Sequence, residues 1–258
     1  IRTAASNIRL FAEEQARSFR GFESERQGMT LGQRIVPLES VGCYVPGGRY
    51  PLPSSALMSI IPAKVAGVKE VIVCSPKITP VTIVAADIAG ADMIFSIGGA
   101  QAIGAMAYGT ETVPKVSKIV GPGNSYVTAA KKEVFGTVGI DFLAGPSEIM
   151  IIADKTADPV LVAADMLAQA EHDPDARADL LTDSYDLAEK VEKEIQFQLK
   201  GIITKAIAKE ALKNSSIIVV DSLIQAAKVA NRRAPEHLEI QTSDPDSITG
   251  KLRHYGSL

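Results

Sequence analysis

Helix-like and strand-like patterns alternate along most of this chain, and this alternation constrains the fold more than any other feature of the sequence. From Pro53 onward, segments with apolar residues at helical spacing are each followed by a short apolar run that ends at turn residues. Such alternation is typical of βα units that build a mostly parallel sheet. We therefore predict an α/β fold.

The pattern falls into two sets of elements. In the first set we expect helices over residues 54–65, 79–89, 99–108 and 125–134, and strands over 71–74, 93–97 and 118–120. In the second set we expect strands over 149–153, 179–182, 216–220 and 238–241, and helices over 159–171, 185–213, 222–231 and 245–252. A helix followed by a short apolar strand recurs in both sets. We therefore predict two lobes of similar α/β design, with the cleft between them as the binding site.

Composition limits the class of protein and its partners. The chain has 258 residues, 46% of them hydrophobic and 22% charged, which suffices for two packed units at about 100 to 200 residues per domain. The net charge is -3 and the lysines and arginines are dispersed among acids, so nucleic acid is not an expected partner. The apolar runs are shorter than the roughly 20 residues that cross a bilayer, and no basic and then apolar leader opens the chain. We predict a cytoplasmic protein with no membrane partner.

The two cysteines, Cys43 and Cys74, lie far apart in the sequence and outside any CxxC spacing. Neither a disulfide framework nor a thiolate zinc site is therefore indicated. Cys43 precedes a glycine-rich loop, which leaves a role as nucleophile open, but no neighbour in the sequence clearly activates its thiol. We interpret both as packing residues in a reducing compartment.

An acid and a base stand side by side in Ala234-Pro235-Glu236-His237-Leu238, in a chain with only three histidines. Adjacent carboxylate and imidazole groups suit proton transfer and the activation of water near neutral pH. The apolar alternation after the pair predicts a strand that holds it at its start. An isolated Glu-His pair at such a junction is more often an ordinary surface feature, so the rest of the chain must decide.

Three glycine-containing loops are candidates for binding a ligand. Glycine lets the backbone approach a ligand closely, and a helix that starts directly after a strand presents free N–H groups to an anion. None of the loops matches GxGxxG or the Walker pattern, and each is also compatible with an ordinary turn. The loops are Gly42-Cys43-Tyr44-Val45-Pro46-Gly47-Gly48-Arg49, Gly98-Gly99-Ala100-Gln101-Ala102-Ile103 and Gly121-Pro122-Gly123-Asn124.

Gln169 and His172 lie three residues apart at the end of a predicted helix, so both side chains project from one face and can reach one metal ion. A glutamine and a single histidine make a poor zinc site without other ligands, and a polar helix end is the alternative interpretation. Ser147, in the turn Ala144-Gly145-Pro146-Ser147-Glu148, offers a hydroxyl to the cleft. No GxSxG motif is present, which disfavours a serine hydrolase.

In combination, six stretches of this sequence closely resemble the histidinol dehydrogenase family. They occur in the same order and with compatible spacings from about Val41 to the end of the chain, so the resemblance is specific. The stretches are Tyr44-Val45-Pro46-Gly47-Gly48, Gly98-Gly99-Ala100-Gln101-Ala102, Gly121-Pro122-Gly123-Asn124, Gly145-Pro146-Ser147-Glu148, Gln169-Ala170-Glu171-His172 and Pro235-Glu236-His237-Leu238.

The resemblance implies an oxidoreductase of histidine biosynthesis that converts L-histidinol to L-histidine through the aldehyde, with two NAD and a bound zinc. It implies that Tyr44, Gln101 and Asn124 contact NAD. Glu236 and His237 would be the acid–base pair. In that pair, His237 removes the hydroxyl proton as hydride leaves, and Glu236 activates the water that attacks the aldehyde.

The same resemblance implies that Gln169 and His172 are zinc ligands that also meet the substrate, with Ser147 and His237 as further substrate contacts. Zinc would hold the substrate amine and imidazole in place, so its main contribution is orientation. Two more zinc ligands, an aspartate and a histidine, would come from a region that follows Leu258.

For the architecture, the resemblance implies two incomplete Rossmann-like lobes with mostly parallel sheets, arranged as in aldehyde dehydrogenases. The first lobe would be discontinuous, residues 1–43 plus 147–258, and would carry the catalytic and metal residues. The second lobe, residues 44–146, would bind NAD. The resemblance also implies an intertwined homodimer whose partner subunits complete each other's active sites. Because Ile1 is not an initiator methionine and residues 254–258 read as a turn into a new strand, we expect a part of a longer polypeptide.

Two other interpretations stay open. A non-catalytic, two-lobed small-molecule binding module would keep the cleft but lack a complete metal site, and zinc affinity distinguishes it from the enzyme. A related aldehyde dehydrogenase would need a reactive cysteine in the cleft, for which Cys43 and Cys74 are weak candidates.

Overall fold

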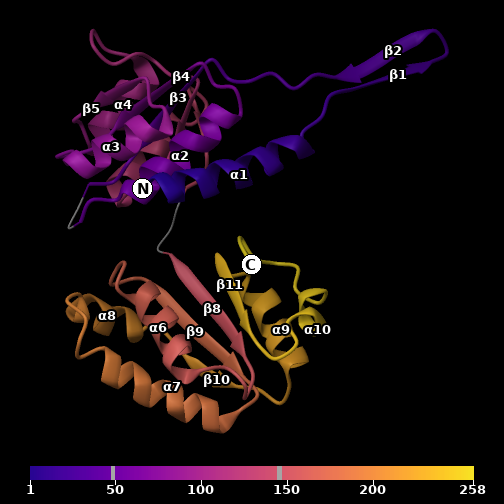
Figure 1. The fold of residues 1–258 in the computed structure, drawn as a ribbon, viewed down its shortest axis with the longest axis vertical. Helices are drawn as coiled ribbons and strands as arrows, with labels where there is room; N and C mark the ends of the chain where they lie inside the picture. Colours follow the sequence, from indigo (N-terminus) through magenta and orange to yellow (C-terminus); the bar gives the residue numbers. More distant parts are fainter. Residues whose placement is uncertain (48–49, 144–146) are drawn as a thin grey trace. The chain divides into compact units, whose positions relative to one another are not determined.

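The computed structural model describes residues 1–47, 50–143 and 147–258, and it divides into two compact units, residues 1–145 and 146–258 (Figure 1). Each unit is built around its own parallel sheet. The α/β fold class with mostly parallel sheets is therefore confirmed. In the part of the chain that is described, no helix combines the length and apolar character needed to cross a membrane.

The first unit contains a five-stranded sheet in the order β5-β4-β3-β6-β7, in which every pairing is parallel. All five residues of the central strand β3 are buried, as expected for a strand covered by helices on both faces. The strands are β3 (Ser40–Tyr44), β4 (Glu70–Cys74), β5 (Met93–Phe95), β6 (Lys118–Val120) and β7 (Gly139–Ile140).

Four helices connect these strands and cover both faces of the sheet. The alternation along β4 sends Val71 and Val73 into a core with α2 and α3, and Ile72 and Cys74 into a core with α4 and α5. Proline opens α2 and α3, where its missing N–H costs no helical hydrogen bond. The helices are α2 (Pro53–Val65), α3 (Pro80–Ala89), α4 (Gly99–Tyr108) and α5 (Ser125–Val134).

The first 33 residues form a helix and a hairpin that the hydrophobic pattern did not predict. Helix α1 (Arg2–Ser18) packs on the core of the first unit through Ala5. Strands β1 (Phe22–Arg26) and β2 (Met29–Gln33) pair antiparallel, and the hairpin extends away from the five-stranded sheet (Figure 1). Gln27 and Gly28 both have positive φ, as a two-residue type I′ turn requires. All ten strand residues are exposed. Because neither face is buried, folding imposes no clear alternation of apolar and polar residues from which these strands could be predicted.

The second unit contains a four-stranded, fully parallel sheet in the order β10-β9-β8-β11. Helices α6, α7 and α8 share a core on one face, and α9 and α10 share another core on the opposite face. The strands are β8 (Glu148–Ala153), β9 (Arg177–Thr182), β10 (Ile217–Val219) and β11 (His237–Gln241), and the helices are α6 (Pro159–Ala170), α7 (Tyr185–Gln198), α8 (Lys205–Leu212), α9 (Leu223–Arg233) and α10 (Asp246–Thr249).

Two expected helices differ in the structure. The prediction of one long helical segment over residues 185–213 was wrong. Two helices occupy this segment, because α7 ends at Gln198 and α8 begins at Lys205. Gly201 lies in the connecting turn, where it avoids the cost of glycine in a helix interior. The helix expected over 245–252 is only the four-residue α10. The prediction that residues 1–43 and 147–258 form one discontinuous lobe stays a prediction. Residues 40–43 lie in β3 of the first unit's sheet.

Candidate functional site

The side chains expected to contact NAD lie at the carboxyl ends of three strands of the first unit. Tyr44 is the last residue of β3, and Gln101 lies in the first turn of α4, after β5. Asn124 follows β6 and is the N-cap of α5, where its Oδ1 accepts a hydrogen bond from the backbone N–H of Val127 at 3.1 Å. Ligands of parallel α/β sheets bind at this end of the strands, so the placement agrees with a binding role.

Close contacts join these loops, and the approach of Gly121 to the Tyr44 backbone requires glycine. The Tyr44 hydroxyl accepts a hydrogen bond of 3.0 Å from the backbone N–H of Gly99. Gly99 has φ +68°, and a Cβ there would lie 2.9 Å from Oε1 of Gln101. Gly121 has φ +111°, and a Cβ there would overlap the carbonyl oxygen of Tyr44. The glycines therefore let three loops pack directly against one another.

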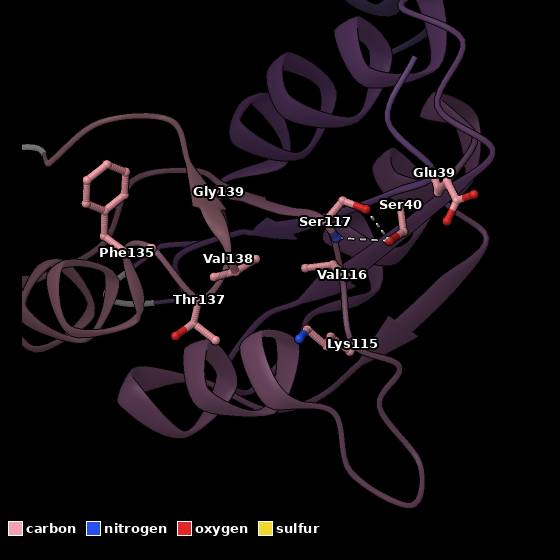
Figure 2. A pocket seen from close by; sticks show the side chains of 10 residues that line it. Glu39, Ser40, Lys115, Val116, Ser117, Phe135, Thr137, Val138 and Gly139 are labelled. Atoms are coloured by element: carbon pink, nitrogen blue, oxygen red, sulfur yellow. Dashed lines mark hydrogen bonds between the residues drawn. The ribbon is translucent and has the colours of Figure 1, made fainter. Parts of the chain in front are cut away.

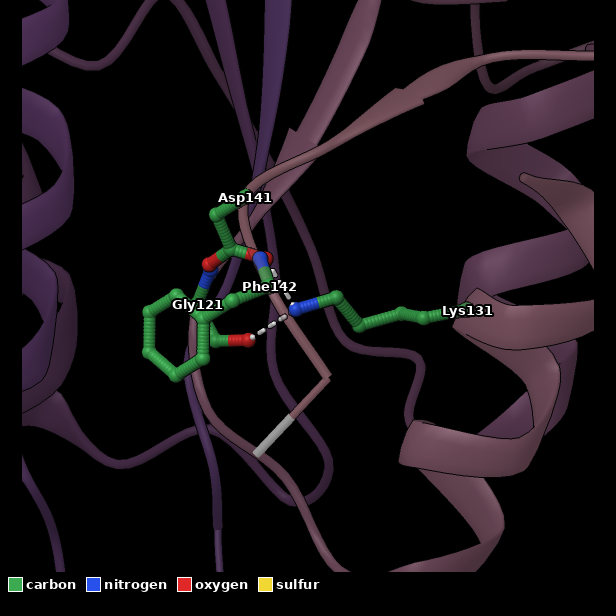
Figure 3. Close-up of polar contacts among 4 residues, drawn as sticks. All are labelled: Gly121, Lys131, Asp141 and Phe142. Carbon is green, nitrogen blue, oxygen red and sulfur yellow. Dashed lines mark hydrogen bonds and ion pairs between the residues drawn. The ribbon is translucent and has the colours of Figure 1, made fainter. Parts of the chain in front are cut away.

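A buried ion pair holds the Gly121 loop (Figure 3). Lys131 is 3% exposed, pairs with Asp141, and donates a hydrogen bond of 3.1 Å to the carbonyl oxygen of Gly121. Asp141 accepts from the N–H of Gly121 at 2.8 Å and from the N–H of Phe142 at 2.7 Å. The Lys131 ammonium also lies 5.6 Å from the centre of the Phe142 ring. Sequence analysis did not identify this pair.

In the second unit, the Glu-His pair lies at the amino end of edge strand β11. His237 is its first residue and pairs with Ile149 of β8 in parallel register. The backbone N–H of Glu148 donates to Oε2 of Glu236 at 3.4 Å. Nε2 of His237 lies 3.9 Å from Oε1 of Glu236, and the two side chains are 48% and 41% exposed. The prediction that a strand holds the pair at its start is confirmed.

The other ring nitrogen of His237 has a partner that sequence analysis missed. Nδ1 lies 2.7 Å from the hydroxyl oxygen of Ser257. Ser257 is held beside the strand by backbone bonds, because its N–H donates to the carbonyl of Glu236 at 2.8 Å and its carbonyl accepts from Leu238 at 2.9 Å. The contact joins residues 20 positions apart, so no local pattern signals it.

The expected zinc ligands lie at the same end of this sheet. Because β8 and β9 are parallel, α6 returns the chain from the carboxyl end of β8 to the amino end of β9. The carboxyl end of α6 therefore brings Gln169 and His172 toward the end of the sheet that holds Ser147, Glu236 and His237.

Gln169 carries the most informative polar atom of this group. The residue is 8% exposed, and its buried Nε2 has no hydrogen-bond partner among the described residues. An unsatisfied buried amide is compatible with a ligand or ion at its polar end, whichever of its two terminal atoms faces outward. His172 is exposed, and its backbone N–H donates to the Gln169 carbonyl at 3.3 Å. Among the described residues, no group of three or more His, Cys, Asp or Glu side chains could hold a metal ion. The His172 imidazole is of a type that binds zinc, and the assignment of Gln169 and His172 as zinc ligands stays a prediction.

Two acidic side chains, Glu239 and Asp165, lie close together further along β11. Nε2 of Gln241 donates to Glu239 at 2.6 Å and to Asp165 of α6 at 2.9 Å. Burial raises the pKa of Glu239, the hydrogen bond from Gln241 lowers it, and the neighbouring Asp165 carboxylate raises it, with a net rise. The two carboxyl groups are thus held together at the side of β11.

The described part of the first unit has a hollow at each end of its sheet. One, of about 550 Å³, lies at the amino end, where the side chain of Ser40 accepts a hydrogen bond of 3.1 Å from the N–H of Ser117 (Figure 2). It contains none of the predicted site residues. The other, of about 140 Å³, is lined by Pro46, Gly47 and Thr79, at the carboxyl ends of β3 and β4.

Both cysteines are packing residues, as predicted. Cys43 and Cys74 are fully buried, and burial is the main cause that raises the pKa of each thiol to about 12. Burial thus disfavours the thiolate form of both residues near neutral pH, which argues against either one as the nucleophile of a cysteine-dependent aldehyde dehydrogenase.

Parts of two predicted motifs lie outside the described residues. These are Gly48 and Arg49 of the first glycine-rich loop and Ala144-Gly145-Pro146 of the turn before Ser147. The first loop is also shorter than expected, because Gly42, Cys43 and Tyr44 belong to β3.

Comparison with solved structures supports the architecture. The crystal structure of histidinol dehydrogenase from Elizabethkingia anophelis is 41% identical, with a TM-score of 0.94 over 98% of this chain and 60% of that chain. A salicylaldehyde dehydrogenase from Pseudomonas putida G7 is 13% identical, with a TM-score of 0.60 over 99% of this chain and 68% of that chain. The second likeness concerns the fold alone, and it agrees with the predicted aldehyde-dehydrogenase-like architecture.

Comparison of sequences identifies the family. Histidinol dehydrogenase of Methanosarcina barkeri is 51% identical over 263 residues, which cover 100% of this chain and 61% of that protein. The chain thus spans about three fifths of the length of this relative. The family model described as histidinol dehydrogenase matches residues 1–258, and the chain therefore belongs to the histidinol dehydrogenase family.

Proposed function

We propose that the protein to which this chain belongs oxidises L-histidinol to L-histidine through the aldehyde, in a zinc-dependent reaction that uses two NAD. Family membership supports the reaction class. The observation that carries the proposal is the gathering of Glu236 and His237 with Gln169, His172 and Ser147 at the amino end of one sheet. Residues that are far apart in the sequence thereby form one candidate site.

His237 is proposed to act as the base of the first oxidation. With its proton on Nδ1, the imidazole donates to the Ser257 hydroxyl at 2.7 Å, and the Nε2 lone pair is left to accept the substrate hydroxyl proton. The C–H bond of the alcohol carbon breaks at the same time, and its hydride leaves to give the aldehyde. NAD, when bound, accepts the hydride.

Glu236 is proposed to act in the second oxidation. Its carboxylate takes a proton from the water that adds to the aldehyde carbon, which gives the monoanion of the aldehyde hydrate. Loss of a second hydride from this monoanion, again to NAD when it is bound, gives the carboxylic acid. The backbone N–H of Glu148 holds one carboxylate oxygen at 3.4 Å, and the other oxygen faces His237 at 3.9 Å.

Tyr44, Gln101 and Asn124 are proposed to contact NAD. Their positions at the carboxyl ends of β3, β5 and β6 support this role, since parallel sheets bind nucleotides at that end. The glycine-dependent packing of the three loops supports it further, because it leaves little side-chain bulk between the backbone and a flat ligand.

Gln169 and His172 are proposed to hold zinc and to meet the substrate, together with Ser147. The buried Nε2 of Gln169, which has no hydrogen-bond partner in the part of the chain that the structure describes, supports a ligand at that position. Zinc, when bound, would orient the substrate amine and imidazole. His172 is exposed and follows the carboxyl end of the helix that carries Gln169.

A homodimer is proposed as the working assembly, with residues of each subunit completing the site of the other. The hairpin of the first unit supports a subunit interface. Phe22, Met29 and Leu31 lie on one of its faces and are 59%, 58% and 58% exposed. A two-stranded hairpin is marginally stable by itself in water, so an apolar face of this kind gains stability from a partner.

The proposal is tested by the ratio of NADH formed to L-histidinol consumed by the native-length protein with zinc supplied. A ratio of two is expected. A ratio of one means that the aldehyde leaves before the second step, which removes the role given to Glu236. No NADH at all favours a non-catalytic binding module instead.

A further inference from the structure

We infer that the buried Lys131–Asp141 pair is a positioning device that holds the loop Gly121-Pro122-Gly123-Asn124 in the conformation that binds NAD. The inference rests on the proposed function, in which Tyr44 and Asn124 contact NAD. Neither charged side chain is assigned a contact with the cofactor. Their effect is exerted through the backbone of Gly121.

The pair fixes both polar groups of the Gly121 backbone. The Lys131 ammonium holds the carbonyl oxygen at 3.1 Å, and the Asp141 carboxylate holds the N–H at 2.8 Å. Gly121 lies against the carbonyl of Tyr44 with φ +111°, a conformation that glycine adopts without strain but other residues rarely adopt. Because glycine has wide conformational freedom, the two hydrogen bonds are what fix its peptide groups at the point where β6 turns into the loop.

The loop is fixed at its other end by the helix that carries Lys131. Asn124 caps α5 through the N–H of Val127, and Lys131 follows two turns later on the same helix. Two hydrogen bonds therefore lie within the segment from Gly121 to Lys131. One joins Asn124 to Val127, and the other joins Lys131 to Gly121. A shift of Gly121 would carry Asn124 with it.

The cost of the pair argues for a role beyond packing. Lys131 and Asp141 have side chains that are 4% and 18% exposed, so both charges lose most of their hydration. Buried ion pairs of this kind are often no more stabilising than apolar residues of the same size. Such a pair is useful where two backbone groups need fixed partners, as the carbonyl and the N–H of Gly121 do. Asp141 also accepts from the N–H of Phe142, so the chain leaving β7 is attached to the same carboxylate.

The same unit contains a matched pair away from the candidate site. Lys64 pairs with Asp92 at 2.5 Å, and the Asp92 carboxylate accepts from the N–H of Val71 at 2.6 Å. Val71 lies near the amino end of β4, at the opposite end of the sheet from Tyr44. This pair has the same chemistry but no link to the proposed NAD loops, which makes it a control.

The test compares Lys131→Met with Lys64→Met in the native-length protein. The Michaelis constants for NAD and for L-histidinol, the kcat and the unfolding temperature are measured for both variants and the wild type. We expect Lys131→Met to raise the Michaelis constant for NAD by about tenfold or more, the effect of losing one charge-assisted hydrogen bond, with little change in that for L-histidinol. Lys64→Met should lower the unfolding temperature but leave the constant for NAD within about twofold of the wild type.

Equal effects of the two variants on the NAD constant, or no effect of Lys131→Met, would overturn the inference. Should Lys131→Met not fold, Asp141→Asn carries the same test, because it keeps the size and an oxygen acceptor but removes the charge. Calorimetric titration of NAD into the wild type separates the two proposals. A wild type that binds NAD but does not oxidise L-histidinol contradicts the proposed reaction alone, whereas a wild type that does not bind NAD contradicts both.

Discussion

The hydroxyl oxygen of Ser257 lies 2.7 Å from Nδ1 of His237, on the side of the ring away from Glu236. This contact engages Nδ1 and leaves Nε2 as the ring nitrogen that can meet a substrate. When the proton is on Nδ1, the lone pair of Nε2 faces the side of the strand where Glu236 lies. The position of Ser257 in turn depends on its two backbone bonds to Glu236 and Leu238.

We expect Ser257→Ala to lower kcat by about tenfold with little change in the Michaelis constant for L-histidinol, because the imidazole loses its fixed orientation but remains present. Steady-state kinetics on the native-length protein provides the measurement. Ser257→Thr keeps the hydroxyl and should recover most of the activity. A Thr variant as slow as the Ala variant would indicate that only the shape of the position matters.

Replacing His172 should weaken zinc binding if it is a ligand. We expect His172→Ala to reduce zinc affinity by at least about 100-fold, measured by competition with a chelator of known affinity. His254→Ala is the matched control, because Nδ1 of His254 lies 3.0 Å from the carbonyl of Asn231 and takes no part in the proposed site. The same loss in both variants would contradict the assignment of His172.

The two thiols should be unreactive in the folded protein. Burial raises the pKa of Cys43 and of Cys74 to about 12, so the thiolate fraction at pH 8 is very small. We expect no alkylation by iodoacetamide of the folded chain and alkylation of both cysteines after unfolding, as read by mass spectrometry. Rapid alkylation of the folded protein with loss of activity would support a cysteine-dependent reaction instead.

Asp154 should contribute a pH-dependent part of the stability of the second unit. Burial raises its pKa, but hydrogen bonds from Thr156 and Ser243 outweigh this and lower the pKa to about 2. A carboxyl group whose pKa is lower in the folded state stabilises the fold above its unfolded pKa of about 4, and this contribution is lost as the pH falls toward 2.

We therefore expect Asp154→Asn to reduce the free energy of unfolding by about 1 to 2 kcal/mol at pH 7, and by less at pH 3. Denaturant unfolding at both pH values measures the difference. Asp186→Asn is the control: Asp186 pairs with Lys190 on the surface, with a side chain 74% exposed, and should change the stability very little. Equal losses at pH 7 and pH 3 would show that the charge of Asp154 is not involved.

Gly121 should tolerate no side chain. We expect Gly121→Ala to destabilise the first unit by about 3 kcal/mol or more. Alanine would be strained at a positive φ, and its Cβ would also overlap the Tyr44 carbonyl oxygen. Gly136→Ala isolates the strain of the positive φ, since Gly136 has φ +96° but no atom within 4 Å of the added Cβ. That control should cost about 1 kcal/mol in a thermal unfolding measurement. Similar costs for the two variants would argue against the close approach of the loops.

Local periodicity was sufficient for most elements that alternate in the two sheets. Strand 118–120 and helix 125–134 have the bounds that the sequence predicts. Periodicity was insufficient where an element is wholly exposed, as in β1 and β2, since no buried face gives the residues a pattern. It also failed over 185–213, where the amphipathic pattern continues on both sides of Gly201 but the helix does not.

The sequence by itself determined the α/β class, the family and the residue types at the strand ends, because these depend on residues close together in the chain. Only the tertiary structure decided which of those ends meet. His237 reaches Ser257 through a parallel bridge between the two residues. Asp141 reaches the backbone N–H of Gly121 because β7 pairs with β6 in parallel register. Strand order and register arise from the packing of two faces at once, so the partner of a polar side chain at a strand end cannot be read from its own segment.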